Sequence, residues 1–207
     1  MWLFTQILTN QKEKILMKKL IAMATALLLS VGAYAQHEVG SVTIQPKIGM
    51  NIASMTDSDD ADVRIGLAIG AEAEYQFTDM FSISGGLLYS MQGYTDDGGG
   101  TDYTCKMDYL NVPILVNCYV VKGLAVKLGI QPGFNINAKA KAEGGNTTIE
   151  SDIDAKTLDF SIPVGISYEL ANFQLDARYN WGLTKVAKGS DCKNSVFQIT
   201  LGYKFEL

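Results

Sequence analysis

The carboxyl-terminal stretch of the chain, residues 197–207, reads FQITLGYKFEL and decides how the fold is interpreted. Its odd-numbered positions are all large and apolar, whereas the even-numbered positions between them are polar, charged or glycine. A period of two residues is typical of a β-strand that has one apolar face and one polar face. The stretch therefore predicts a terminal β-strand.

The same period recurs upstream from about residue 42, and no helical period interrupts it. Glycine is abundant, at 20 residues, and proline is scarce, at 4, which suits many strands joined by tight turns. The mature chain is therefore predicted to be all-β and antiparallel, with eight strands. The predicted strands cover residues 42–53, 63–77, 81–94, 103–120, 124–136, 158–170, 173–183 and 197–207.

The connections between these strands alternate between short and long. Short turns are predicted at Thr78-Asp79, Lys122-Gly123 and Ala171-Asn172. All short turns then lie at one end of the sheet, as they do in transmembrane barrels, where the long loops face outward. The longer polar links are residues 55–62, 95–102, 138–156 and 186–193.

Two belts of aromatic residues decide which face meets lipid. One face is almost entirely apolar and carries aromatics near both strand ends, which suits the headgroup levels of a bilayer. A soluble barrel with an apolar interior and an open β-sandwich are the alternatives, but neither sorts aromatics by height. The sequence therefore predicts an eight-stranded up-and-down transmembrane β-barrel in contact with outer-membrane lipid. The two predicted belts are Tyr75, Phe77, Phe81, Tyr168, Phe173, Tyr203 and Phe205 below, and Tyr89, Phe134, Phe160, Tyr179, Trp181 and Phe197 above.

The opposite face carries charges of both signs, which the barrel places in its lumen. An eight-stranded barrel is just wide enough for side chains, and unpaired charge there would be costly. Near balance between the signs therefore predicts ion pairs that fill the lumen. The residues are the cations Lys47, Arg64, Lys127, Arg178 and Lys204, and the anions Glu72, Glu74, Asp159, Glu169, Asp176 and Glu206.

The amino end is typical of an export signal. Lys18 and Lys19 precede an apolar run, and Ala33-Tyr34-Ala35 supplies the small-x-small pattern of a cleavage site. Residues 1–35 are therefore predicted to be a cleaved signal peptide, and residues 36–207 the barrel. Met17 fits a start codon, which would make residues 1–16 a misassigned upstream start.

Three stretches of the mature chain resemble a known family. They are KIGMN at residues 47–51, YLNVPIL at residues 109–115 and GYKFEL at residues 202–207. The chain resembles the outer-membrane β-barrel domain family of Bacteroidota, called PorT-like or porin-family. The resemblance implies an eight-stranded outer-membrane barrel without shared catalytic residues, and its best-known relatives belong to a secretion system. The aromatic terminal strand also suits recognition by the barrel assembly machinery through strand pairing.

Sites for chemistry are few. His37 is the single histidine and lies outside every predicted strand, so no enzyme activity is expected. Net charge of −5 argues against nucleic acid. The Asp57–Asp62 loop begins like a calcium loop but lacks the required glycine and glutamate, so no metal or cofactor is predicted. Cys105 and Cys192 could bridge two external loops, and the sequence leaves this open.

Two functions remain open for this predicted barrel. The first is a structural or interaction scaffold that presents external loops, with a partner that the sequence leaves unidentified. The second is a transport or secretion component, either a small porin or a PorT-like subunit. A soluble ligand-binding barrel in the periplasm is a third, weaker reading.

Overall fold

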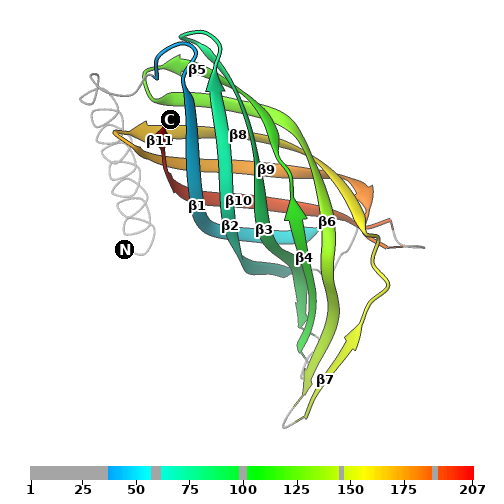
Figure 1. The fold of residues 1–207 in the computed structure, drawn as a ribbon. Coiled ribbons are helices and arrows are strands. Elements are labelled where there is room, and N and C mark those ends of the chain that lie inside the picture. The colour runs from blue at the N-terminus through cyan, green and yellow to red at the C-terminus, as the bar shows by residue number, and fades with distance from the viewer. Residues whose placement is uncertain (1–36, 57–61, 98–101, 145–146, 188–190) are drawn as a thin grey trace, which may run out of the picture. The chain divides into compact units, whose positions relative to one another are not determined.

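The computed structural model describes residues 37–56, 62–97, 102–144, 147–187 and 191–207. The predicted signal peptide, residues 1–35, and the acidic positions 57–60 lie outside the described residues. Over the described part every regular element is a strand, as Figure 1 shows. The strands are β1 (Val42–Met55), β2 (Asp62–Gln76), β3 (Phe81–Asp97), β4 (Asp102–Asn111), β5 (Ile114–Val121), β6 (Leu124–Gly144), β7 (Thr147–Asp152), β8 (Leu158–Leu170), β9 (Phe173–Lys185), β10 (Lys193–Tyr203) and β11 (Phe205–Glu206).

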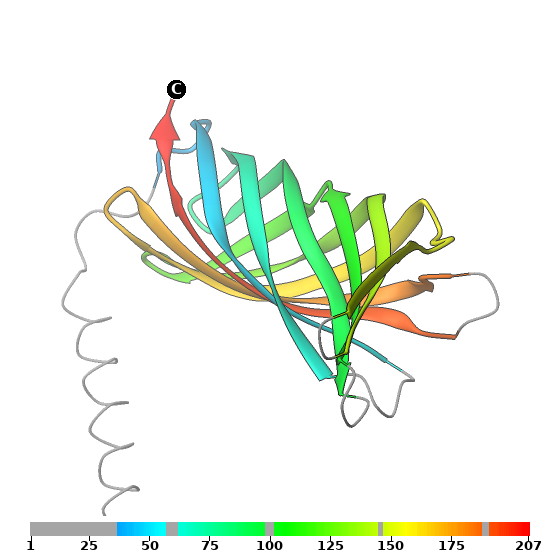
Figure 2. The same ribbon diagram turned by 90° about the horizontal axis from the view of Figure 1, so that it is seen from below.

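The strands form a closed antiparallel ring. Each ring strand pairs with the strands on either side of it, and β1 pairs with β10 to close the circle, with Ile48 opposite Leu201. Within the described residues the ring has eight strands, in which β4 with β5, and β10 with β11, each count as one, and β7, which pairs only with β6, lies outside the ring. Figure 2 shows the first strand alongside the last. The predicted fold class is therefore confirmed.

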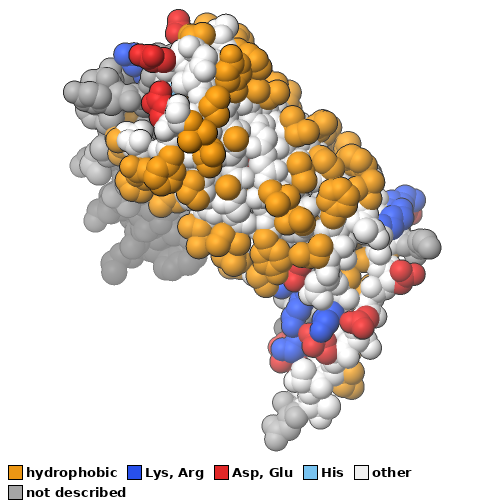
Figure 3. Space-filling model, in the orientation of Figure 1, with side chains coloured by type: hydrophobic (Ala, Val, Ile, Leu, Met, Phe, Trp, Pro, Cys, Tyr) orange, Lys and Arg blue, Asp and Glu red, His pale blue; other side chains and the backbone are white. Residues whose placement is uncertain are grey.

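The two faces of the wall have opposite polarity, as the two-residue period predicts. On β1, Lys47 points into the lumen and is 3% exposed, whereas its neighbour Ile48 points outward and is 54% exposed. The outward side chains are large and apolar over much of the ring, and Figure 3 shows them covering the barrel wall on one side. Charged and amide side chains fill the inside. This arrangement suits a wall that is solvated by lipid.

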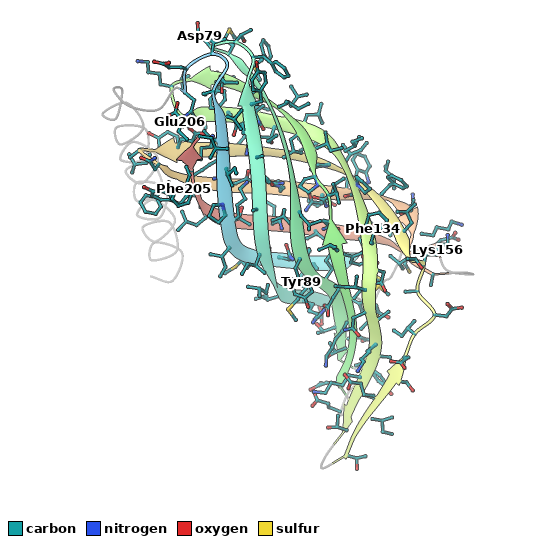
Figure 4. The ribbon with its side chains drawn as sticks, viewed as in Figure 1. Asp79, Tyr89, Phe134, Lys156, Phe205 and Glu206 are labelled. Atoms are coloured by element: carbon teal, nitrogen blue, oxygen red, sulfur yellow. The ribbon has the colours of Figure 1, made fainter. Side chains whose placement is uncertain are left out.

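The short turns lie where the sequence predicted them. Residues 77–80 join β2 to β3, Lys122-Gly123 joins β5 to β6, and Ala171-Asn172 joins β8 to β9. Gly123 takes a positive φ of 77°, a conformation that glycine adopts without strain. Figure 4 shows Asp79 at the short-turn end of the ring and Lys156 at the opposite end of the ring.

The fourth predicted strand is interrupted, because Pro113 has no N–H to donate. The wall stays closed on both sides of the break. The Val112 N–H donates to the carbonyl of Pro132 at 2.8 Å, and the Gly86 N–H donates to the carbonyl of Pro113 at 3.1 Å. The last predicted strand is likewise broken at Lys204, whose N–H donates to the carbonyl of Asn172 at 2.7 Å.

Two of the predicted long loops are largely strands. The prediction of a loop over residues 138–156 is wrong, because β6 continues to Gly144 and pairs with the extra strand β7. The link predicted over residues 95–102 is shorter, since β3 runs to Asp97 and β4 begins at Asp102. The outer parts of β3, β4 and β6, together with β7, project beyond the ring in Figure 1. We call this four-stranded part the extension.

Candidate functional site

The lumen holds a layer of five charged side chains at its middle. Asp176 lies at the centre, within 2.7 Å of Lys127 Nζ, 2.8 Å of Arg178 Nε and 3.5 Å of Lys47 Nζ. Glu72 accepts from Lys47 at 2.6 Å and from Arg178 at 2.9 Å. None of the five residues is more than 3% exposed. Three cations and two carboxylates leave one excess positive charge in this layer.

A second charged layer lies closer to the short-turn end. Lys204 forms ion pairs with Glu169 and, at 2.8 Å, with Glu74. The Tyr119 hydroxyl lies between the two carboxylates, 2.7 Å from Glu74 Oε1 and 2.8 Å from Glu169 Oε1. One cation and two carboxylates leave one excess negative charge. The two layers together therefore balance, four cations against four anions.

The prediction that lumenal charges pair with each other is confirmed for these eight residues and fails for three others. Glu206 is wrong as a lumenal anion, because it lies past the break at Lys204 and its side chain is 55% exposed. Arg64 donates instead to the backbone carbonyl of Gln92. Asp159 accepts from neutral groups, Thr184 at 2.5 Å and Asn194 at 3.3 Å.

An apolar cluster, which we call the cap, lies at the long-loop end of the barrel. It consists of five buried side chains from β1, β4 and the residue that follows β9, so it crosses from one side of the ring to the other. Partly buried side chains from β3 and from the segments beside β7 and β10 pack against it. Sequence reasoning missed this cap, because its members come from segments that are far apart in the chain. The cap is Met55, Cys105, Met107, Tyr109 and Val186, with Tyr94, Ile153, Ala155 and Cys192 packed against it.

The cap brings the two candidate disulfide partners into one cluster. Cys105 is buried within it, and Cys192 packs against it from the link before β10. No disulfide joins them in the structure. Cys118 lies elsewhere, on the outward face of β5.

The outer wall changes character at a bulge between β4 and β6. Asp108 pairs with Asn137 and Tyr109 with Asn135, so Ile136 has no counterpart on β4. The extra residue reverses which residues of β6 face outward. Asn137 donates to Asp108 at 2.9 Å, so polar side chains replace apolar ones on the outer surface at this level.

Above the bulge the outer surface is charged. Lys106 donates to Glu150 at 3.1 Å, Lys139 lies 3.8 Å from the same carboxylate, and Lys141 pairs with Glu143 at 2.6 Å. The hydrogen bond and positive charge of Lys106 lower the pKa of Glu150 below its ordinary value. Figure 3 shows these charges gathered where the strands leave the apolar wall. The extension therefore stands in water, outside the apolar band.

The remaining candidates from the sequence are the single histidine and the metal site. His37 lies at the short-turn end, 3.7 Å from both Glu169 and Glu206. The part of the chain that the structure describes contains no group of three side chains placed to hold a metal ion. The calcium-like positions 57–60 are outside that part. No helix among the described residues is long and apolar enough to cross a membrane.

Comparison with known proteins identifies the family. A family model described as "Outer membrane protein beta-barrel domain" matches residues 34–188 of the 207. The chain belongs to this family. As a member of the outer membrane protein beta-barrel domain family, the protein is located in the outer membrane, in contact with its lipid. The broader part of the resemblance seen in the sequence is thus confirmed.

Several solved outer-membrane barrels are similar to this family member. Ail, the attachment invasion locus protein of Yersinia pestis, is 18% identical, over 81% of this chain and 100% of that one, with a TM-score of 0.49. Neisserial surface protein A is 17% identical, over 79% of this chain and 97% of that one, with a TM-score of 0.48. OprG from Pseudomonas aeruginosa is 15% identical, over 84% of this chain and 99% of that one, with a TM-score of 0.47. Among curated proteins none matches the chain.

Proposed function

We propose that the protein is a closed outer-membrane barrel that acts as a structural or interaction scaffold and presents its extension outside the cell. The observation that supports this proposal most directly is the sealed lumen. Two charged layers and an apolar cap occupy it, and a barrel of eight strands has little room besides its own side chains. What remains available to partners is the extension.

The same proposal includes the roles of the two ends of the chain in export and assembly. Residues 1–35 act as a cleaved signal peptide, and the aromatic terminal strand is recognised by the barrel assembly machinery. The protein assigned this way has no catalytic activity and binds no nucleic acid. The mass of the purified protein tests the first point, since cleavage predicts a chain that begins at Gln36.

Transport or secretion is the competing function, whether as a small porin or as a PorT-like subunit of Bacteroidota. No contact within the described residues favours it over the scaffold. Deletion of the gene followed by a secretion assay tests the PorT-like role, because a scaffold would leave secretion of cargo unchanged.

Conductance tests the sealed lumen itself. The purified barrel, inserted in a planar lipid bilayer, is expected to pass no steady ion current. The matched variant combines Met107→Ala with Tyr109→Ala, which removes two of the five cap side chains and leaves both charged layers in place. A steady current through the unmodified protein would overturn the proposal and favour transport.

Labelling on intact cells tests which end faces outward. In a background without native cysteines, Thr148→Cys on β7 is expected to react with a membrane-impermeant maleimide. Asp79→Cys, in the turn between β2 and β3, is the matched control and should react only after the outer membrane is permeabilised. The reverse pattern would place the extension in the periplasm and contradict the proposed presentation outside the cell.

A further inference from the structure

Two large apolar side chains are exposed where lipid cannot cover them. Most exposed apolar residues lie on the outer wall of the barrel, where the bilayer solvates them. Tyr103 is 49% exposed and Ile149 is 62% exposed, yet both lie on the extension, beyond the bulge at Ile136. Exposed apolar groups gathered in water mark a binding surface more often than they are accidental.

These two side chains share one face of the extension, which the register of the four strands defines. Tyr103 lies opposite Ala142, and Ala142 lies opposite Ile149. On the other side Tyr103 lies opposite Asp96 of β3. Side chains that are directly opposite in a sheet point to the same face. This inner face is continuous with the apolar cap, whereas Lys106, Lys139 and Lys141 occupy the outer face.

The inner face is hollowed into a cavity of about 450 Å³. All four strands of the extension contribute to it, and Cys105 of the cap lines it as well. Cavities of this size, with mainly apolar and aromatic lining and a few polar groups, are typical of small-molecule sites. The lining that matters here is Tyr94, Tyr103, Ala140, Ala142, Ile149 and Ile153.

An acidic cleft of about 290 Å³ opens beside the cavity and shares Asp96, Tyr103 and Thr104 with it. It adds three more carboxylates, those of Asp62, Asp102 and Glu143. Lys141 contributes to the cavity lining, but its side chain belongs to the outer face, and its ammonium pairs with Glu143 at 2.6 Å. By register Asp96 shares the inner face with Tyr103, whereas the side chains of Asp62 and Asp102 belong to the other face. Asp96 is therefore the carboxylate that the cavity offers to a positive charge.

The geometry points to a small amphipathic organic cation as the ligand: an amine that carries an aromatic or aliphatic body. The body fits the apolar cavity, and the ammonium group lies toward Asp96, where cavity and cleft meet. The ring of Tyr103 lines both spaces and can contact the cation through its face. An anion would be repelled by the carboxylate of Asp96, and a neutral apolar molecule would leave that carboxylate unused. This inference rests on the proposed function, because it assigns a ligand to the presented extension.

The test uses three probes of equal shape and different charge. These are 4-phenylbutylamine, uncharged 4-phenylbutanol and anionic 4-phenylbutyrate, each titrated by calorimetry into the full barrel in phosphatidylcholine nanodiscs, with empty nanodiscs subtracted. The amine is expected to bind at one site, and the alcohol about tenfold more weakly or worse, with the acid weakest. Raising the salt concentration should weaken binding of the amine, because salt screens the attraction between exposed charges.

Four variants test where the amine binds. Tyr103→Ala should weaken amine binding about tenfold and Asp96→Asn about three- to tenfold, within the range of cation–π and partly exposed ionic contacts. Asp152→Asn is the matched control, because it removes the same charge outside the cavity, and it should leave binding unchanged. Tyr103→Phe keeps the ring and should retain most of the affinity.

The outcomes separate this inference from the scaffold proposal. Equal binding of amine and alcohol, or amine binding that survives Tyr103→Ala, would overturn the inference, as would the absence of any binding. A barrel that binds no amine but also conducts no ions would still be a scaffold. A barrel that conducts would overturn the scaffold whether or not the amine binds.

Discussion

The barrel wall and the extension are built from the same strands, yet their polarity is opposite. Within the wall, β6 turns Leu128 outward and Lys127 inward. Past the bulge, the same strand turns Lys139 outward and Ala140 toward the inner face. The strand period is two in both regions, and the extra residue at the bulge reverses which parity of β6 faces outward. The reversal suits the surroundings of each region, because lipid surrounds the wall and water surrounds the extension.

The two regions also differ in how far their charged groups are buried. In the wall, charges are buried and each makes several contacts, so removal of one leaves others uncompensated. In the extension, charges are exposed and screened, and each pair contributes little. Substitution of matched residues in the two regions should therefore give very different results.

The largest effect is expected from Asp176→Ala, which removes the carboxylate that three buried cations contact. The free energy of unfolding should fall by about 3–5 kcal/mol, as for other broken buried ion pairs. Urea titration in lipid vesicles measures it, with the heat-dependent gel shift of a folded barrel as readout. Asp152→Ala on the extension should change stability by less than about 0.5 kcal/mol.

A second substitution keeps this prediction testable if Asp176→Ala does not fold. Adding Lys127→Met removes one of the cations left without its partner, so the double variant should recover part of the lost stability. Equal stability of Asp176→Ala and the unmodified barrel would show that water reaches the middle layer and screens it.

An intermediate effect is expected when an apolar residue is replaced by a charged one, first on the lipid-facing wall and then on the extension. Leu128→Arg puts the charge on the lipid-facing wall and should destabilise the barrel by about 2–4 kcal/mol. Ile149→Arg puts it on the extension, and the loss should be below about 0.5 kcal/mol. The same titration measures both. Similar losses at the two positions would mean that the extension also meets lipid.

The smallest effect concerns the pH dependence of the extension. Lys106 lowers the pKa of Glu150, so this pair stabilises the folded extension above the pKa that Glu150 has when unfolded. The contribution is lost as the pH falls through the lowered value. Lys106→Ala should raise the pKa of Glu150 toward its ordinary range, as carboxyl NMR signals can show. An unchanged pKa would mean that Lys106 does not contact Glu150 in solution.

The sequence predicted the ring well, because inward and outward faces of a strand can be seen directly in a two-residue period. It predicted less well where the strands pass into water. Residues 139–143, KAKAE, do alternate, but small alanines and charges gave no apolar face to recognise. The bulge at Ile136 also reversed the parity, so the alternation on either side could not be joined into one strand.

The contents of the lumen were partly predictable for a related reason. Strand parity alone correctly places ten of the eleven charges inside, but it does not say where a strand leaves the ring, so Glu206 was assigned wrongly. The cap depends on Met55, Tyr109 and Val186 meeting across the ring. Only the closed register of eight strands brings such residues together, and no local pattern records it.

The bulge between β4 and β6 has a consequence for how deeply the molecule sits. Below it the outer surface is apolar, and directly above it Asp108 and Asn137 begin the polar surface. If the barrel moved up in the membrane, its apolar wall would be exposed to water. If it moved down, charged side chains would enter the hydrocarbon. The barrel is therefore held at one height, and a thinner or thicker bilayer must deform around it or tilt it. In this way one inserted residue matches the protein to the thickness of its membrane.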